Sequence, residues 1–209
     1  MRIAVSRKCK CIAATFLLIQ SLFCHHVEVL FSPGDHLASK LIAKIEAAKT
    51  KVWAAVYMIT NKKIAQALII AKERGLDVQV ITDLSTVESP YGKAEMLTKA
   101  GIPVMVFCTR LHFVSKNKDK IWNNAPIMHN KFAIIDNIVW TGSFNWTVAA
   151  DRKNRENVTI LDDKVSLLQF SSEFGRLKRQ SNLLGTYKTI RRFEDVFGLM
   201  SRFFSKFLS

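Results

Sequence analysis

Cysteine is scarce in this sequence, and its placement excludes a domain held together by disulfide bonds. Three of the four cysteines, Cys9, Cys11 and Cys24, fall within the first 24 residues, and Cys108 stands alone further along. Their spacing, even with the two histidines after Cys24, fits no standard zinc finger, so no metal site is expected. Glycine and proline are also few, at 8 and 4 of 209 residues, which excludes collagen-like and low-complexity classes.

The chain also has few acidic residues relative to basic ones. The chain has 17 Asp and Glu against 31 Lys and Arg, for a formal net charge of +14. Such an excess predicts a polyanionic partner, either nucleic acid or an anionic phospholipid surface, and charge alone does not choose between them. The 49% of hydrophobic residues and the length indicate one globular domain with a core of its own.

Residues 1–26 resemble a targeting segment. Four basic side chains precede an apolar run, Ile12 to Phe23, which is shorter than the roughly 20 residues of a membrane span. No small-x-small cleavage site follows the run. The segment is therefore either a signal peptide, which predicts a periplasmic or secreted protein, or an N-terminal membrane anchor.

Strand and helix patterns alternate over residues 27–180 and predict an α/β catalytic domain. The expected strands are Val27–Phe31, Val52–Ile59, Val78–Thr82, Ile102–Phe107, Met128–Ile135, Ile138–Thr141 and Asn157–Leu161, and the expected helices are Leu37–Lys49, Lys62–Arg74, Lys93–Ala100 and Lys164–Arg179. The strands at Met128–Ile135 and Ile138–Thr141 are expected to form a hairpin around Asp136-Asn137.

Two segments fall outside this alternation. The stretch 109–126 is polar and basic and should form a surface loop, with substrate-binding candidates Lys116, Lys118, Lys120 and Trp122. Residues 181–209 are expected to form a basic amphipathic C-terminal helix, with aromatic residues at helical spacing from residue 186. Its apolar stripe could pack on the domain or on a second subunit, or it could bind a membrane surface.

The chemistry is concentrated between residues 129 and 145. In a strand, alternate side chains share a face, so His129 and Lys131 project together and Asp136 does not. Imidazole can attack a phosphodiester, and a fixed ammonium neutralises charge on the non-bridging oxygens. Asp136, at the turn, suits a structural task instead.

The next segment, Gly142-Ser143-Phe144-Asn145, follows at a strand-to-helix junction. Glycine permits close backbone approach there, and the Ser143 and Asn145 side chains can donate hydrogen bonds to phosphate oxygens. Glu156, at the start of a later strand, is a candidate to accept from the second ring nitrogen of His129 and so to fix its tautomer.

Together, these residues resemble the phospholipase D superfamily. His129, Lys131 and Asp136 match its H-x-K-x4-D signature, and Gly142, Ser143 and Asn145 match its companion motif. The sequence further looks like the single-motif branch that includes bacterial periplasmic endonucleases and mitochondrial cardiolipin hydrolases. One departure is that five residues, not the usual six, separate Asp136 from Gly142, which predicts a tightened hairpin.

The resemblance implies a phospholipase D-like fold, which is a mixed, mostly parallel sheet with helices on both faces. It also implies a two-step reaction without a metal or cofactor, in which one histidine forms a phosphohistidine and a second protonates the leaving group. Because the chain has one copy of the motif, a homodimer is expected to pool two copies in one groove.

Three functions are compatible with the sequence. The first is a metal-independent endonuclease on single-stranded nucleic acid, favoured by the charge and the basic loop. The second is a phospholipase D acting on phosphatidyl lipids or cardiolipin, favoured by the apolar N-terminal segment and the Phe-rich tail. The third is a non-catalytic binding protein, which the intact motif disfavours.

Overall fold

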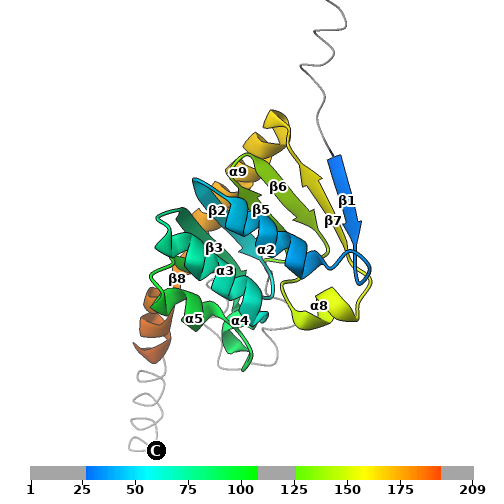
Figure 1. Cartoon of the computed structure of the whole chain (residues 1–209). Coiled ribbons are helices and arrows are strands. Elements are labelled where there is room, and N and C mark those ends of the chain that lie inside the picture. Colours follow the sequence, from blue (N-terminus) through cyan, green and yellow to red (C-terminus); the bar gives the residue numbers. More distant parts are fainter. Residues whose placement is uncertain (1–26, 108–125, 194–209) are drawn as a thin grey trace, which may run out of the picture.

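The computed structural model describes residues 27–107 and 126–193, which form one eight-stranded sheet with helices on both faces (Figure 1). The strand order is β1-β7-β6-β5-β2-β3-β4-β8. The strands are β1 Val27–Phe31, β2 Lys51–Val56, β3 Asp77–Asp83, β4 Val104–Phe107, β5 Lys131–Ile135, β6 Ile138–Gly142, β7 Asn157–Leu161 and β8 Ser181–Leu183. The helices are α2 Leu37–Ala47, α3 Lys62–Glu73, α4 Leu84–Glu88, α5 Ala94–Lys99, α8 Val148–Arg152 and α9 Lys164–Arg179. The α/β prediction is therefore confirmed.

The sheet is mixed, as expected, but it is not mostly parallel. Only β2 with β3 and β3 with β4 pair in parallel, and the other five neighbouring pairs are antiparallel. Helical crossovers join β2 to β3 and β3 to β4, as parallel pairing requires. The rest of the sheet contains a tight hairpin and strands that return in the opposite direction, so the prediction of a mostly parallel sheet was wrong.

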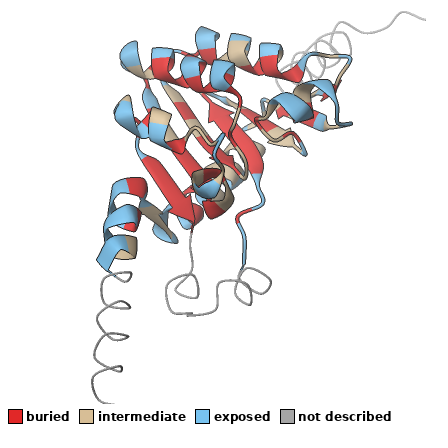
Figure 2. Cartoon of the chain, turned by 90° about the horizontal axis from the view of Figure 1, so that it is seen from below, coloured by how far each residue is buried: buried red, intermediate tan, exposed pale blue. Residues whose placement is uncertain are grey.

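The two faces of the sheet bury separate apolar clusters. Helices α2, α3 and α5 cover one face, and α9 lies on the other (Figure 1). Strand β2 contributes to both, because Ala54 and Val56 enter the larger cluster and Ala55 enters the cluster under α9. Figure 2 shows the buried residues on the central strands and on the inward sides of these helices. Strands covered on both faces give a rigid base for a site at their ends.

The chain adds to the sheet beyond Arg179. Strand β8 pairs antiparallel with β4, and residues 184–193 continue as a helix. Leu184 and Tyr187 of this helix are buried in the larger core cluster. The boundary expected at residue 180 therefore lies inside the packed domain. The expected C-terminal helix was wrong at its start, because residues 181–183 form β8. Residues 184–193 are helical, and the expected continuation over 194–209 lies outside the described residues, as does segment 1–26.

No helix in the described part of the chain has the length and apolar character needed to cross a membrane.

The hairpin between β5 and β6 is closed by a two-residue turn, Asp136-Asn137, as the shortened spacing predicted. Asp136 has a φ of 50°, which suits such a turn. Its carboxylate accepts hydrogen bonds from the backbone N–H groups of Lys49, Thr50 and Lys51 and from the Thr50 hydroxyl, at 2.7–3.0 Å. The side chain thus ties the hairpin to the start of β2.

These hydrogen bonds govern the titration of Asp136. Burial alone would raise its pKa, but the hydroxyl of Thr50 and three backbone N–H groups favour the carboxylate and lower the pKa to about 2. Since the folded pKa is below the ordinary 3.8, the group stabilises the fold above about pH 4 and loses that effect as the pH falls through about 2.

We expect Asp136→Asn to lower the free energy of unfolding at pH 7 by about 1–3 kcal/mol, because hydrogen bonds to a charged acceptor are lost. The difference in unfolding free energy between the two proteins should shrink as the pH falls from about 4 to about 2, where the carboxylate of the unmutated protein protonates. Urea unfolding across this range measures both effects. Glu46→Gln on the exposed side of α2 is the matched control. An unchanged stability of Asp136→Asn at pH 7 would contradict the anchoring role.

Candidate active site

The motif residues gather where β2 and β3 end and β5 begins. Antiparallel pairing of β2 with β5 places Lys131 opposite Val56, the last residue of β2. Tyr57 then leaves the sheet, and its N–H donates to the Asn130 carbonyl oxygen at 2.8 Å. Asp83 ends the neighbouring strand β3 and is buried. Carboxyl ends of parallel strands are a common location for sites in α/β folds.

The predicted strand over Met128–Ile135 forms only from Lys131 onward, so His129 lies in the extended segment just before β5. This segment is held from one side, because the Met128 N–H donates to Asp83 Oδ2 at 2.9 Å. His129 remains exposed. An exposed imidazole at the strand ends of a rigid sheet is accessible to a substrate.

Lys131 is 8% exposed, which is rare for an ammonium group. Its Nζ donates to the His129 carbonyl oxygen at 2.7 Å and lies 5.2 Å from the centre of the Tyr57 ring. Both contacts fix the charge beside His129. The structure thus brings together the two residues that the sequence placed on one face.

Tyr57 is the residue at this site that the sequence did not predict. Its ring centre lies 4.7 Å from that of His129, with the planes tilted by 58°. The same ring therefore contacts the imidazole and lies under the ammonium of Lys131. Asp83 was also missed. Both follow or end buried parallel strands, and that position in the sequence was the available signal.

The surroundings adjust the protonation of both motif residues. Although the His129 side chain is exposed, the protein atoms beside it displace part of its water and lower its pKa. The Lys131 ammonium lowers this pKa further, and the Asp83 carboxylate acts in the opposite direction. Burial also lowers the pKa of Lys131, and the Glu156 carboxylate opposes that shift. The imidazole consequently stays neutral, and able to attack, at a lower pH than a free histidine.

Backbone hydrogen bonds hold the companion motif, residues 142–145, beside the loop after β2. A Cβ at Gly142 would lie 2.1 Å from the Asn157 carbonyl oxygen, so only glycine fits between β6 and β7. Further along, the Trp146 N–H donates to the Met58 carbonyl at 3.0 Å, and the Trp146 carbonyl accepts from Thr60 and Asn61. Residues 142–146 are therefore held beside the segment that begins with Tyr57.

Ser143 and Glu156 contact one another. The Ser143 hydroxyl donates to Glu156 Oε2 at 2.6 Å, and the Asn154 amide donates to Oε1 at 2.9 Å. Among the residues that the structure describes, no hydrogen bond joins Glu156 to His129, so the expected pairing is not formed in this chain. The carboxylate orients Ser143 and acts on Lys131 through its charge.

Asn145 presents an unused acceptor. Its Oδ1 atom is buried and has no hydrogen-bond partner within the described chain. Buried polar atoms are nearly always satisfied, and exceptions often occur where a partner or ligand is absent. The described chain therefore leaves this buried oxygen unsatisfied.

The remaining candidates, Lys116, Lys118, Lys120 and Trp122, lie in segment 108–125, outside the described residues. Within residues 27–107 and 126–193, no three or more His, Cys, Asp and Glu side chains are grouped so that they could hold a metal ion.

We expect the Tyr57 ring, and not its hydroxyl, to matter at this site. Tyr57→Phe should retain activity, whereas Tyr57→Leu should lower kcat about 5- to 30-fold, because a cation–π contact of about 1–2 kcal/mol is lost. Loss of the ring also hydrates the imidazole, so the acid limb of the pH–rate profile should move to higher pH. Steady-state kinetics on a small phosphodiester measure both effects. Equal kcat values and pH profiles for the two variants would contradict this role.

Comparison with known proteins gives one consistent result. The sequence profile of the family described as "Cardiolipin synthase, PLD-like domain" matches residues 41–178. Mitochondrial cardiolipin hydrolase of Xenopus laevis is 33% identical over 144 residues, which are 68% of this chain and 61% of that protein. Phospholipase D of Rickettsia prowazekii is 30% identical over 166 residues, covering 78% of this chain and 73% of that protein.

Two solved structures share the fold. Nuc, a phospholipase D family member from Salmonella typhimurium, has a TM-score of 0.64 at 30% identity and covers 76% of this chain and 97% of its own. NucT from Helicobacter pylori has a TM-score of 0.66 at 27% identity and covers 77% and 99%.

The mixed sheet and the His129–Lys131 pair at its strand ends define a phospholipase D-like protein. The chain belongs to the phospholipase D superfamily, in the family whose profile matches residues 41–178. The match spans about three fifths of the Xenopus laevis relative.

Proposed function

We propose that this protein is a metal-independent phosphodiesterase in which His129 is the covalent nucleophile. The main support is that the exposed His129 imidazole, whose pKa is lowered, lies beside the nearly buried ammonium of Lys131. The imidazole attacks phosphorus, a P–N bond forms, and the P–O bond to the leaving group breaks. Lys131 neutralises the non-bridging oxygens as charge develops on them.

The second step returns the enzyme to its first state. Water attacks the phosphohistidine, the P–N bond breaks, and the phosphoryl product leaves. A second imidazole gives its proton to the departing oxygen in the first step and takes one from water in the second.

That second imidazole belongs to another copy of the chain in this proposal, because the motif occurs once per chain. A two-fold axis through the site would pool His129, Lys131, Ser143 and Asn145 from both copies. The unpartnered Asn145 Oδ1 and the exposed His129 support the idea that the site is incomplete in one chain. Glu156 of either copy would then be the candidate to orient an imidazole.

The substrate we favour is single-stranded nucleic acid. The net charge of +14 supports this choice. So does the likeness to Nuc and NucT, whose chains are covered to 97% and 99%. The alternative is a phosphatidyl lipid or cardiolipin, supported by the names of the Xenopus laevis and Rickettsia prowazekii relatives. Segment 1–26 would deliver the enzyme to an exported location or hold it at a membrane, and either substrate is accessible there.

One parallel assay separates these possibilities. The full chain is given single-stranded DNA, single-stranded RNA and cardiolipin-containing vesicles in excess EDTA. Cleavage of nucleic acid that weakens steeply with salt is the expected result, because phosphate contacts release counterions. Release of lipid products alone would move the assignment to a phospholipase D, and turnover that requires added metal would contradict the mechanism.

A further inference from the structure

Tyr91 is the most exposed large hydrophobic side chain that the structure describes, at 73% of its surface. It belongs to the turn between α4 and α5. Neither the catalytic motif nor the core uses it. A single exposed aromatic ring needs no explanation by itself, so its surroundings decide whether it can bind a ligand.

The turn that presents Tyr91 is firmly built. The Gly92 N–H donates to the Ser89 carbonyl at 3.0 Å, and the Tyr91 N–H donates to the Ser89 hydroxyl at 3.3 Å. A Cβ at Gly92 would lie 1.8 Å from the Thr86 carbonyl oxygen, so the turn is pressed against α4. The ring therefore projects from a fixed backbone, which lowers the entropy cost of binding a ligand there.

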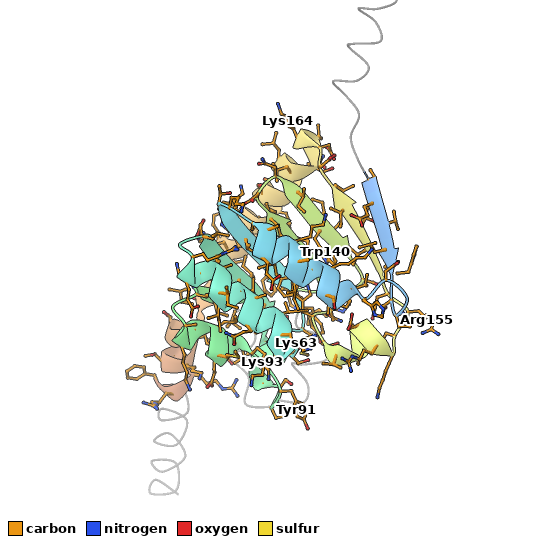
Figure 3. The ribbon with its side chains drawn as sticks, in the orientation of Figure 1. Lys63, Tyr91, Lys93, Trp140, Arg155 and Lys164 are labelled. Carbon is orange, nitrogen blue, oxygen red and sulfur yellow. The ribbon has the colours of Figure 1, made fainter. Side chains whose placement is uncertain are left out.

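The charge around the turn is positive. Lys93 Nζ donates to the Tyr91 carbonyl at 2.6 Å, and Figure 3 shows Tyr91, Lys93 and Lys63 at the same lower end of the molecule. The acids flanking the turn are already neutralised, since Glu88 pairs with Arg191 and Glu95 with Lys188 of the helix after β8.

Two lysines at this end of the molecule, Lys63 and Lys93, have no such partners (Figure 3). Within the described residues, no acidic side chain forms an ion pair with Lys63 or Lys93. Lys63 is exposed, and Lys93 is half-buried. These ammonium groups and Tyr91, here called the Tyr91 surface, combine a ring with uncompensated positive charge.

The Tyr91 surface is joined to the catalytic end by the segment that follows β2. The Lys93 N–H donates to the Ile59 carbonyl at 3.0 Å. Ile59 is two residues from Tyr57, whose ring contacts His129, and two residues of extended chain span about 7 Å. One short backbone segment therefore joins the Tyr91 surface to the residues around His129.

We propose that the Tyr91 surface is a subsite for single-stranded nucleic acid, in which a base stacks on Tyr91 and the lysines contact flanking phosphates. The inference rests on the proposed function and names its substrate class. An aromatic ring with surrounding cations is the arrangement by which proteins bind single strands without reading their sequence. A membrane would require a continuous apolar area, but the neighbours of Tyr91 along the chain are Pro90, Gly92 and lysine.

The test uses equilibrium binding and kinetics together. Full-length His129→Asn protein, with and without Tyr91→Ala, is titrated with a labelled oligothymidylate of about 20 nucleotides and with anionic phospholipid vesicles. In the His129 background, Tyr91→Ala is assayed on the oligonucleotide and on bis(p-nitrophenyl) phosphate, a small diester without nucleobases or flanking phosphates. Phe31→Ala, an exposed ring on edge strand β1, is the matched control.

We expect Tyr91→Ala to weaken oligonucleotide binding and to raise the KM for oligonucleotide cleavage, each about 5- to 100-fold. Hydrolysis of the small diester should be unchanged. Tyr91→Phe should bind the oligonucleotide as the parent does. Lys63→Gln with Lys93→Gln should lower the salt dependence of binding by about 1.4 in the logarithmic slope. Oligonucleotide affinity equal to that of the parent would overturn the inference even if His129-dependent cleavage stands. Tyr91-dependent binding to vesicles alone would also overturn it. Lowered oligonucleotide binding without any cleavage would support the subsite and contradict the proposed function instead.

Discussion

Metal-free turnover by the His129→Asn protein is expected to be at least about 10⁴-fold below that of the unmutated chain. Removal of the nucleophile in a covalent mechanism costs about that much or more, because the remaining site cannot form the intermediate. Asparagine is similar in polarity and size to histidine, and His129 is exposed, so the fold should persist. Hydrolysis of a phosphodiester in excess EDTA measures the effect.

The control for this variant is His36→Asn. His36 lies at the N-terminus of α2, outside the motif, and has a φ of 51°, a conformation that asparagine accepts. The same chemical change there should leave kcat unaltered. If the two variants were equally active, His129 would not be the nucleophile.

Lys131→Met is expected to lower kcat by about 10²–10³-fold while the protein unfolds no more easily. Loss of one fixed electrostatic contact to a developing oxyanion typically has that effect on rate. The stability should be kept or improved, because removing a nearly buried ammonium relieves its desolvation cost and methionine fills similar volume. Steady-state kinetics and thermal unfolding of the same samples measure both quantities.

The pH dependence of the unmutated enzyme provides a second measure of Lys131. Since burial lowers its pKa, activity should decline on the alkaline side at a lower pH than a free lysine would give. Lys164→Met, an exposed residue at the far end of the molecule, is the control (Figure 3). A Lys131→Met enzyme with full kcat, or one that is inactive only because it is unfolded, would contradict the electrostatic role.

Much of the fold was predictable because periodicity and turn chemistry are local. The Asp136-Asn137 hairpin and the strands on either side of it were expected from alternation and spacing, and the structure contains them. The direction of pairing was not predictable in this way. The apolar pattern of a strand is the same in a parallel and an antiparallel pair, so the proportion of parallel strands was overestimated. Strand β8, with three residues of which two are polar, has no apolar pattern to detect.

The site was predictable only where its residues are close in sequence. His129 and Lys131 form one motif, and their contact follows from a separation of two residues. Tyr57 meets His129 only because β2 and β5 pair in one register, which no local pattern specifies. For the same reason, Glu156 was expected at His129 but hydrogen-bonds to Ser143 and Asn154.

The most direct test of the central claim is to trap the phosphohistidine. The full chain is mixed with bis(p-nitrophenyl) phosphate in excess EDTA, quenched in alkali during turnover and digested for peptide mass spectrometry. The account predicts a p-nitrophenyl phosphoryl group on the peptide that contains His129, formed together with one equivalent of p-nitrophenolate and then lost to water. Turnover without this adduct, or an adduct on a peptide that lacks His129, would contradict it.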